Sequence, residues 1–138
     1  MTIEEKEQEI IDEFAIYDDW MDKYEYIIEL GKDLPLIDES SKTEDKLIKG
    51  CQSKVWVHAE EKEGKIYFTA DSDAVITKGI IALLIRVLNG EEPKAIATTE
   101  LDFIKTIGLH EHLSPTRSNG LVSMVKQMKM YAISLANV

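Results

Sequence analysis

The chemistry open to this chain centres on one sulfur atom. Cys51 is the only cysteine among 138 residues, and it lies between Gly50 and the polar pair Gln52-Ser53. Glycine adopts backbone conformations that other residues avoid, and the following run Val55-Trp56-Val57 is typical of a strand. The pattern therefore predicts a loop at a strand entrance, where a reactive group can be presented. A lone cysteine is also commonly a small buried hydrophobe, so the local sequence leaves both interpretations open.

A thiol on such a loop can transfer sulfur with little need of a general base. Exchange between sulfur atoms needs an accessible thiolate, and an ordinary cysteine is only about 3% ionised at pH 7. Lys49 and Lys54 flank Cys51, and nearby cations favour the thiolate. Arg117 is a third candidate if the start of the last helix folds beside the cysteine loop. We therefore expect these cations to activate the thiol.

Other kinds of site are poorly supported by the sequence. The candidate metal ligands are Cys51 and three histidines, His58, His110 and His112, without paired Cys-x-x-Cys ligands. We expect one of His110 and His112 to make a loop hydrogen bond and the other to be solvated. A Cys-His hydrolase needs a base and an oxyanion hole that spacing alone does not establish. The sequence contains no phosphate-binding glycine loop, serine nucleophile elbow or dinucleotide fingerprint, which leaves a thiol without partner groups that the sequence identifies.

The composition suits one domain spanning residues 1–138 in a reducing compartment. One cysteine allows no intrachain disulfide, no run of eighteen apolar residues suggests a membrane span, and the acidic N-terminus does not resemble a signal peptide. We therefore predict a cytoplasmic protein. The net charge is −10, and residues 1–45 carry sixteen acidic and four basic side chains. We interpret this segment as a solvated helix face, with steering toward a basic partner as the alternative, and expect no nucleic-acid binding.

The elements that position Cys51 are several helices and a small sheet. Apolar spacing predicts helices over 3–17 and 20–30, the second capped by Asp18 or Asp19 and ended by Gly31 in a left-handed conformation. Residues 46–48 are expected to form a short strand that enters the cysteine loop. A hairpin over 54–60 and 65–70 follows, with one face in the core.

Helices fill the second half of the chain. Asp71-Ser72-Asp73 precedes a strongly apolar helix over 74–88, for which Asp73 is the expected N-cap. A short helical turn begins at Glu91-Glu92-Pro93, a further helix covers 100–107, and a final helix begins at Ser114-Pro115. Several helices around one antiparallel sheet of about three strands make this an α+β protein.

Four ordered motifs resemble the SufE/CsdE family of sulfur acceptor proteins, the Fe-S metabolism associated domain. The match covers nearly the whole chain, and the order of the motifs makes it specific. The first motif is Tyr26-Ile27-Ile28-Glu29-Leu30-Gly31 with Leu34-Pro35, and the second is Gly50-Cys51-Gln52-Ser53 with Val55-Trp56. The third is Asp71-Ser72-Asp73-Ala74 with Lys78-Gly79, and the fourth is His112-Leu113-Ser114-Pro115-Thr116-Arg117-Ser118-Asn119-Gly120-Leu121.

The resemblance implies a carrier that works between two proteins. Cys51 would accept sulfane sulfur from a SufS-type cysteine desulfurase, stimulate that enzyme, and pass the sulfur to a SufBCD-type scaffold for iron-sulfur cluster assembly. Pyridoxal phosphate would belong to the desulfurase, and this chain would be a carrier rather than an enzyme. The implied fold is similar to the IscU scaffold, but such a scaffold uses three cysteines and this chain has one. A homodimer remains open.

The resemblance also assigns expected roles near the thiol. Arg117 would support the loop or the persulfide anion, while Gly50, Gln52 and Ser53 would set the shape of the loop. Asp73 matches a family position near the loop or the partner surface. We further expect the loop to fold the sulfur against apolar side chains and to swing out on docking. Two alternatives remain: a regulatory interaction module that carries no sulfur, and a redox-sensing thiol protein.

Overall fold

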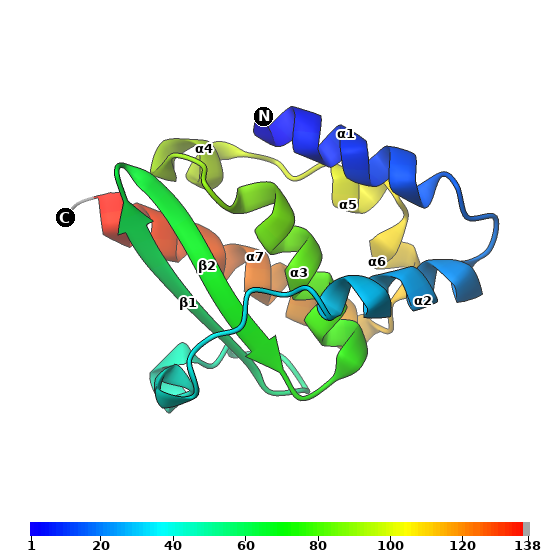
Figure 1. Cartoon of the computed structure of the whole chain (residues 1–138). Coiled ribbons are helices and arrows are strands. Elements are labelled where there is room, and N and C mark those ends of the chain that lie inside the picture. Colours follow the sequence, from blue (N-terminus) through cyan, green and yellow to red (C-terminus); the bar gives the residue numbers. More distant parts are fainter. Residues whose placement is uncertain (137–138) are drawn as a thin grey trace.

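A computed structural model describes residues 1–136, so positions 137 and 138 of the predicted domain lie outside the described residues. The chain is α+β, as predicted, and the order of its elements is visible in Figure 1. The helices and strands are α1 (Ile3–Phe14), α2 (Trp20–Gly31), β1 (Val55–Lys62), β2 (Lys65–Ser72), α3 (Val75–Leu88), α4 (Pro93–Thr98), α5 (Phe103–Thr106), α6 (Leu109–His112) and α7 (Pro115–Ala136), with single 3₁₀ turns at Glu39–Ser41 and Glu44–Lys46.

The sheet is a two-stranded antiparallel hairpin. Its turn residues Glu63 and Gly64 both have positive φ, 53° and 80°, which is the geometry that matches the natural twist of paired strands. The strands alternate between buried and more exposed side chains, as expected. The expected third strand is wrong, because Leu47 makes only an isolated bridge with Trp56. Gly50, with φ of 92°, turns the chain away before a longer ladder can form.

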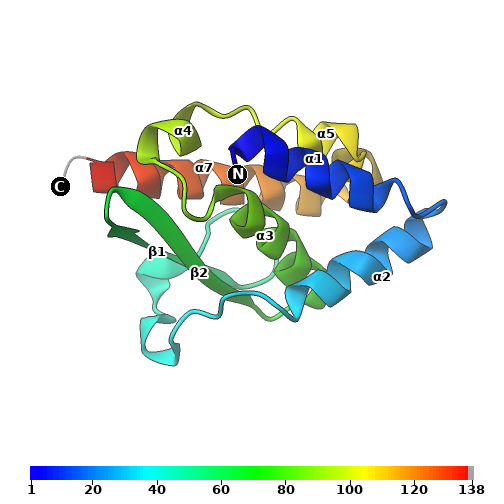
Figure 2. The ribbon, with the colours of Figure 1, turned by 45° about the horizontal axis from the view of Figure 1, so that its top comes forward.

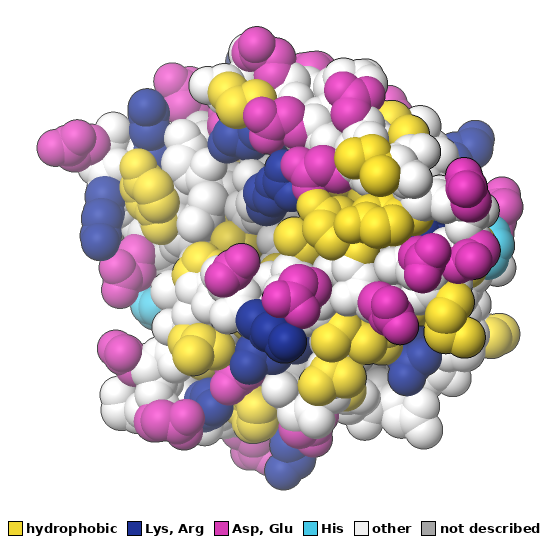
Figure 3. Space-filling model, turned by 45° about the vertical axis from the view of Figure 1, so that its right-hand side comes forward, with side chains coloured by type: hydrophobic (Ala, Val, Ile, Leu, Met, Phe, Trp, Pro, Cys, Tyr) yellow, Lys and Arg dark blue, Asp and Glu magenta, His cyan; other side chains and the backbone are white. Residues whose placement is uncertain are grey.

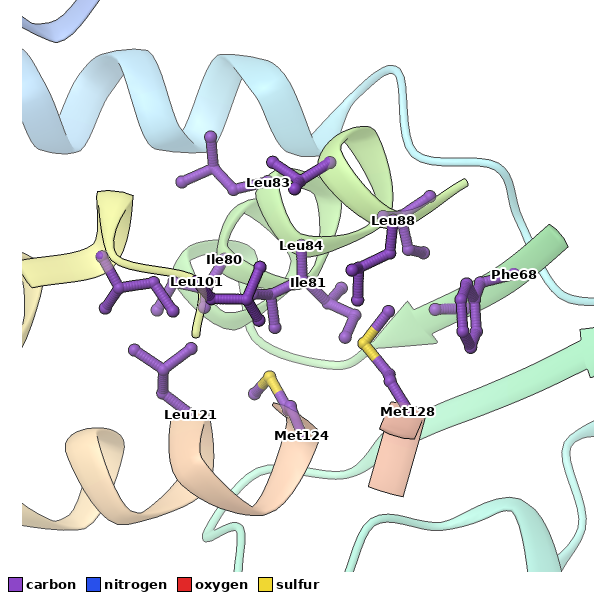
Figure 4. Packing of buried hydrophobic residues seen from close by; sticks show 14 of the residues in the cluster. Phe68, Ile80, Ile81, Leu83, Leu84, Leu88, Leu101, Leu121, Met124 and Met128 are labelled. Carbon is purple, nitrogen blue, oxygen red and sulfur yellow. The ribbon is translucent and has the colours of Figure 1, made fainter. Parts of the chain in front are cut away.

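Helix α3 forms the centre of the core. Nine of its fourteen residues are buried, and it contacts α1, α2, α7 and strand β2 (Figure 2). Figure 4 shows the apolar side chains of α3 facing those of α7 and β2. From α7 the buried contributors are Leu121, Met124, Met128 and Ala132. This packing holds α7 along the strands, and the N-terminal part of α7 lies beneath the cysteine loop.

Two glycines set the crossing of α2 and α3. A Cβ atom on Gly79 would lie 2.1 Å from the carbonyl oxygen of Ile27, and one on Gly31 would lie 3.0 Å from the backbone nitrogen of Gly79. The prediction of a left-handed C-cap at Gly31 is wrong, because this residue is the last of the helix and Lys32 follows in a right-handed conformation. Gly31 is small because another helix passes there.

The acidic N-terminal helix is held against the rest of the fold by an ion pair and hydrogen bonds. Helix α1 has a capping box and ends at Phe14, three residues before the predicted end. The Glu13 carboxylate pairs with Arg86 of α3 and accepts a hydrogen bond from Tyr26 of α2. Glu7 accepts a hydrogen bond of 2.9 Å from the backbone nitrogen of Phe103. On the face seen in Figure 3, acidic side chains are scattered over the surface with exposed apolar side chains between them.

Of the later short helices, α4 and α5 follow the predictions, whereas α6 (Leu109–His112) is not predicted from the sequence. Pro93 opens α4, and Gly108, with φ of 77°, ends the segment of α5 as expected. The regular part of α5 is shorter than predicted, because Leu101 has φ of 52° and interrupts the helix near its start. Within residues 1–136, none of the helices has the length and apolar character needed to cross a membrane.

Candidate functional site

The cysteine loop is closed at both ends by backbone hydrogen bonds. Before the thiol, the nitrogen of Ile48 donates to the carbonyl oxygen of Val55 at 2.8 Å. After the thiol, the nitrogen of Lys54 donates to a carboxylate oxygen of Asp73 at 3.0 Å, and the nitrogen of Asp73 donates back to the carbonyl oxygen of Lys54 at 3.2 Å. Cys51 therefore lies on a short loop with fixed ends, in agreement with the loop that the sequence predicts.

Asp73 is part of this closure and is not a helix N-cap. The N-cap position of α3 is Ala74, whose side chain cannot accept a hydrogen bond. Asp73 lies one residue too early, and its carboxylate turns to the loop instead. The expected N-cap role of Asp73 is therefore wrong, and the residue fixes the C-terminal end of the cysteine loop.

The loop rests on two small residues of α7. A Cβ atom on Gly120 would lie 3.2 Å from the sulfur of Cys51, and one on Gly50 would lie 2.7 Å from the hydroxyl oxygen of Ser123. Gly120 and Ser123 are three positions apart and share one face of the helix. The thiol points at the carbonyl oxygen of Gly120, to which it donates a hydrogen bond of 3.6 Å. We call Gly120 and Ser123 the thiol seat.

Burial, rather than the neighbouring cations, sets the ionisation of the thiol. Cys51 is half-buried and packs against the hydrophobic core. This burial raises the pKa of Cys51, since an ion is poorly solvated there. Lys49 and Lys54 are both exposed, and neither offsets the effect. The expected activation by flanking lysines is therefore wrong for this conformation of the loop.

Behind the loop lies a cavity of about 180 Å³ that brings Cys51 and Arg117 together. The buried residues Thr77 and Ile80 of α3 contribute to its wall, and the remaining contributors are Gln52, Ser53, Ser114, Thr116, Gly120 and Met124. Arg117 is exposed, and its guanidinium pairs with no carboxylate in residues 1–136. Ser114 caps α7 as predicted, since its hydroxyl accepts from the nitrogen of Arg117 at 3.3 Å.

Known proteins resemble this chain over nearly its whole length. A family model described as SufE, the Fe-S metabolism associated domain, matches residues 8–132. The chain belongs to the SufE family. A SufE-like protein of Rhizobium meliloti is 41% identical over 129 residues, which cover 90% of this chain and 92% of the relative. Membership of the family associates the chain with iron-sulfur metabolism and sulfur transfer.

Two further matches extend the comparison. SufE-like protein 1 of Arabidopsis thaliana, described as chloroplastic/mitochondrial, is 40% identical over 94% of this chain, which spans only 35% of the plant protein. The solution structure of a hypothetical protein from Thermus thermophilus has the same fold, with a TM-score of 0.80 at 21% identity, and the match covers 96% of this chain and 97% of that one.

The histidines of this SufE-family chain lie away from the cavity behind Cys51. The His112 ring stacks on Trp20 with centroids 4.0 Å apart and hydrogen bonds to the carbonyl oxygen of Gly108 at 2.9 Å. His110 is exposed to solvent and lies 3.4 Å from the hydroxyl oxygen of Ser118, so the pair agrees with the expectation of one loop hydrogen bond and one solvated ring. His58 lies on β1, 3.4 Å from Glu60. No group of three metal-ligating side chains occurs within residues 1–136.

Sequence reasoning missed the residues on which the thiol rests. Gly120 belongs to a motif of the SufE family but carried no expected role, and Ser123 and Thr77 carried none either. Gly120 and Ser123 lie three apart on the first turns of the final helix, and that spacing of small residues is the signal that points to a close approach.

Proposed function

We propose that this chain carries sulfur for iron-sulfur cluster assembly as a persulfide on Cys51. The donor is a SufS-type cysteine desulfurase, whose activity the chain stimulates, and the acceptor is a SufBCD-type scaffold. One observation carries the proposal: the lone thiol rests on a loop with fixed ends beside a cavity of about 180 Å³. A sulfur atom added to Cys51 has room there, and a carrier needs such protection because persulfides react with other thiols.

The transfer step is balanced without an oxidant or reductant. The Cys51 thiolate attacks the outer sulfur of the donor's cysteine persulfide, and its electron pair forms the new sulfur–sulfur bond. The old sulfur–sulfur bond breaks, and its electron pair leaves with the donor cysteine as a thiolate. Cys51 releases its proton to solvent before attack, and the donor thiolate takes one up afterwards. Pyridoxal phosphate serves the desulfurase, so this chain needs no cofactor of its own.

The other site residues support the carrier in different ways. Arg117 lines the same cavity as Cys51, and its guanidinium would supply positive charge for a persulfide anion. Gln52 and Ser53 line that cavity from the loop, and Gly50 allows the turn before the thiol. Asp73 closes the loop after the thiol. Opening this closure releases the sulfur to a partner.

The test is sulfur loading followed by intact mass. The protein is incubated with its cognate desulfurase and cysteine, and its mass is measured without reductant. A gain of one sulfur on the wild type, absent from Cys51→Ser, is the expected result. If neither protein gains sulfur while both stimulate the desulfurase, the chain is an interaction module and the carrier proposal fails. A redox sensor would instead form a sulfenic acid or mixed disulfide on mild oxidation, which the raised pKa of Cys51 disfavours.

A further inference from the structure

The cavity behind the cysteine loop has an exposed mouth and a buried inner wall. The exposed residues that line the mouth are Gln52, Ser114, Thr116 and Arg117. The buried residues that line the inner wall are Thr77, Ile80, Gly120 and Met124. Ile80 and Met124 belong to the core cluster shown in Figure 4. Cys51 is half-buried and lines the same cavity, so a sulfur atom added to it can turn toward the mouth or toward the inner wall.

Thr77 is an unusual residue for the inner wall. It is 5% exposed, and within residues 1–136 it is the only polar or charged residue that is buried. The other buried positions of α3 hold glycine, isoleucine, leucine and valine. Threonine and valine have nearly the same shape and differ in the hydroxyl group. Packing alone therefore does not account for a threonine at this position.

The Thr77 hydroxyl has no hydrogen-bond partner among residues 1–136. A threonine in a helix can donate to the carbonyl oxygen four residues earlier, as Thr106 does to Asp102 at 3.1 Å, but Thr77 makes no such bond. Its oxygen is not sealed in the protein either. In the part of the chain that the structure describes, the only fully enclosed side-chain nitrogen or oxygen without a partner is Nδ1 of His58. The Thr77 hydroxyl therefore opens on the cavity that this residue lines.

The position of Thr77 in α3 is favourable for a negative charge. Thr77 is the third residue of the helix, and the N-cap residue Ala74 makes no side-chain hydrogen bond to the first turn. The first turn itself contains no acidic residue, and the carboxylate of Asp73 binds the backbone nitrogen of Lys54 instead. Free N–H groups give a helix N-terminus a partial positive charge. An anion at the inner wall would thus meet a free hydroxyl donor near the positive end of a helix.

We propose that the Thr77 hydroxyl binds the outer sulfur of the Cys51 persulfide and holds it as an anion at the inner wall of the cavity. The inference rests on the proposed function and adds the residue that recognises the carried sulfur. Without that sulfur, the Cys51 thiol donates to the carbonyl oxygen of Gly120, and the Thr77 hydroxyl stays unpaired. A buried hydroxyl without a partner costs free energy, which a bond to the added sulfur recovers.

This bond would protect the carried sulfur while the loop is closed. A persulfide anion repels an incoming thiolate, so holding the outer sulfur in its charged form slows its removal by unrelated thiols. Thr77 belongs to the central helix α3, whereas Cys51 belongs to the loop. Opening the loop would therefore break the bond and release the sulfur to the correct partner.

The test follows the loss of sulfur from chemically loaded protein. Cys51 is loaded with inorganic polysulfide, the excess is removed, and intact mass reports how fast dithiothreitol removes the added sulfur. Thr77→Val keeps the shape and lacks the donor, so it loses the sulfur about three- to tenfold faster than the wild type. Thr77→Ser keeps a hydroxyl and restores slow loss. Thr106→Val, at an exposed position of α5 outside the cavity, is the matched control and behaves like the wild type.

A second measurement separates a bond to the carried sulfur from a structural effect. Because the hydroxyl is unpaired without that sulfur, unloaded Thr77→Val should be at least as stable as the wild type in a denaturant titration. Iodoacetamide should also alkylate its unloaded Cys51 at the wild-type rate. If alkylation accelerates by the same factor as sulfur loss, Thr77 holds the loop rather than the sulfur, and the proposal is overturned. Equal rates of sulfur loss from Thr77→Val and the wild type overturn it as well.

Loading by the desulfurase tests the proposed function separately. A wild type that gains no sulfur from the desulfurase and cysteine refutes the carrier, while protein loaded with polysulfide still reports on the contact with Thr77. Conversely, the carrier stands and the role of Thr77 is refuted if the desulfurase loads both proteins and Thr77→Val keeps its sulfur as long as the wild type.

Discussion

The contact between Gly120 and the thiol gives the sharpest prediction for this site. In Gly120→Ala the new Cβ atom would lie 3.2 Å from the Cys51 sulfur and 3.8 Å from the Cα and Cβ atoms of Cys51. Carbon atoms in contact normally lie about 3.5–4.0 Å apart, and sulfur is larger than carbon. The sulfur must therefore move by several tenths of an ångström, away from the carbonyl oxygen that it contacts at 3.6 Å.

Opposing effects keep the overall stability of the variant near that of the wild type. Alanine in a helix interior is favoured over glycine by about 0.5–1 kcal/mol. Overpacking costs about 1–3 kcal/mol, but here the loop can relieve it by leaving the thiol seat. The overpacking therefore raises the free energy of the closed loop relative to the open loop. A change of about 1.4 kcal/mol in this difference shifts the ratio of closed to open loop tenfold.

The assay is the rate at which iodoacetamide alkylates Cys51 as a function of pH. Burial raises the pKa of Cys51 in the closed loop, so the wild-type rate climbs only as pH rises through that raised value. Gly120→Ala is expected to react about tenfold faster near neutral pH, with its profile moved to lower pH. Asn119→Ala, at an exposed neighbour on the same helix, is the control and keeps the wild-type profile. A Gly120→Ala variant that folds but reacts like the wild type would refute the proposed seat.

Three further predictions concern the closure of the cysteine loop, the core and the partly buried phenol of Tyr26. Asp73→Ala removes an acceptor that closes the cysteine loop, so alkylation of the thiol accelerates while circular dichroism is unchanged. Gly79→Ala brings a Cβ atom to 2.1 Å from the Ile27 oxygen, and lowers the free energy of unfolding by about 3 kcal/mol in a denaturant titration. Burial and Glu13 raise the pKa of Tyr26 to about 12, so its absorbance titrates there and the signal is lost in Tyr26→Phe. The neutral phenol stabilises the fold fully below the ordinary tyrosine pKa of about 10, and this contribution disappears as pH rises from 10 to 12.

Local signals in the sequence are sufficient to predict most of the elements. Alternation and a glycine at the turn predict the hairpin, and the turn itself uses Glu63 and Gly64. Asp19 and Ser114 cap the helices that follow them, because a capping side chain bonds to backbone only three residues away. Such contacts join residues that are close in the sequence, so they can be predicted without knowing the rest of the fold.

The wrong predictions share a different cause, which is contact between distant segments. Gly31 is expected to end a helix in a left-handed conformation, but it is small because α3 crosses it. Asp73 is expected to cap the helix beside it, but its carboxylate binds a backbone nitrogen nineteen positions earlier. Residues 46–48 have the composition of a strand, yet pairing depends on how far the partner chain runs alongside before Gly50 turns away. The composition of a segment alone does not specify which distant segments it will contact.

The position of Cys51 protects the sulfur but also lowers the reactivity of the thiol. In the closed loop the thiol is half-buried, donates to the Gly120 carbonyl oxygen and has a raised pKa, and each of these features disfavours the thiolate that the proposed transfer requires. The same features shield the sulfur from unrelated thiols between partners. We therefore expect docking to do more than bring two sulfur atoms together. A donor that draws the loop off Gly120 would also expose Cys51 to solvent and remove the burial that raises its pKa. Ionisation would then coincide with the arrival of the correct partner, which makes the opening of the loop the step that gives sulfur transfer its specificity.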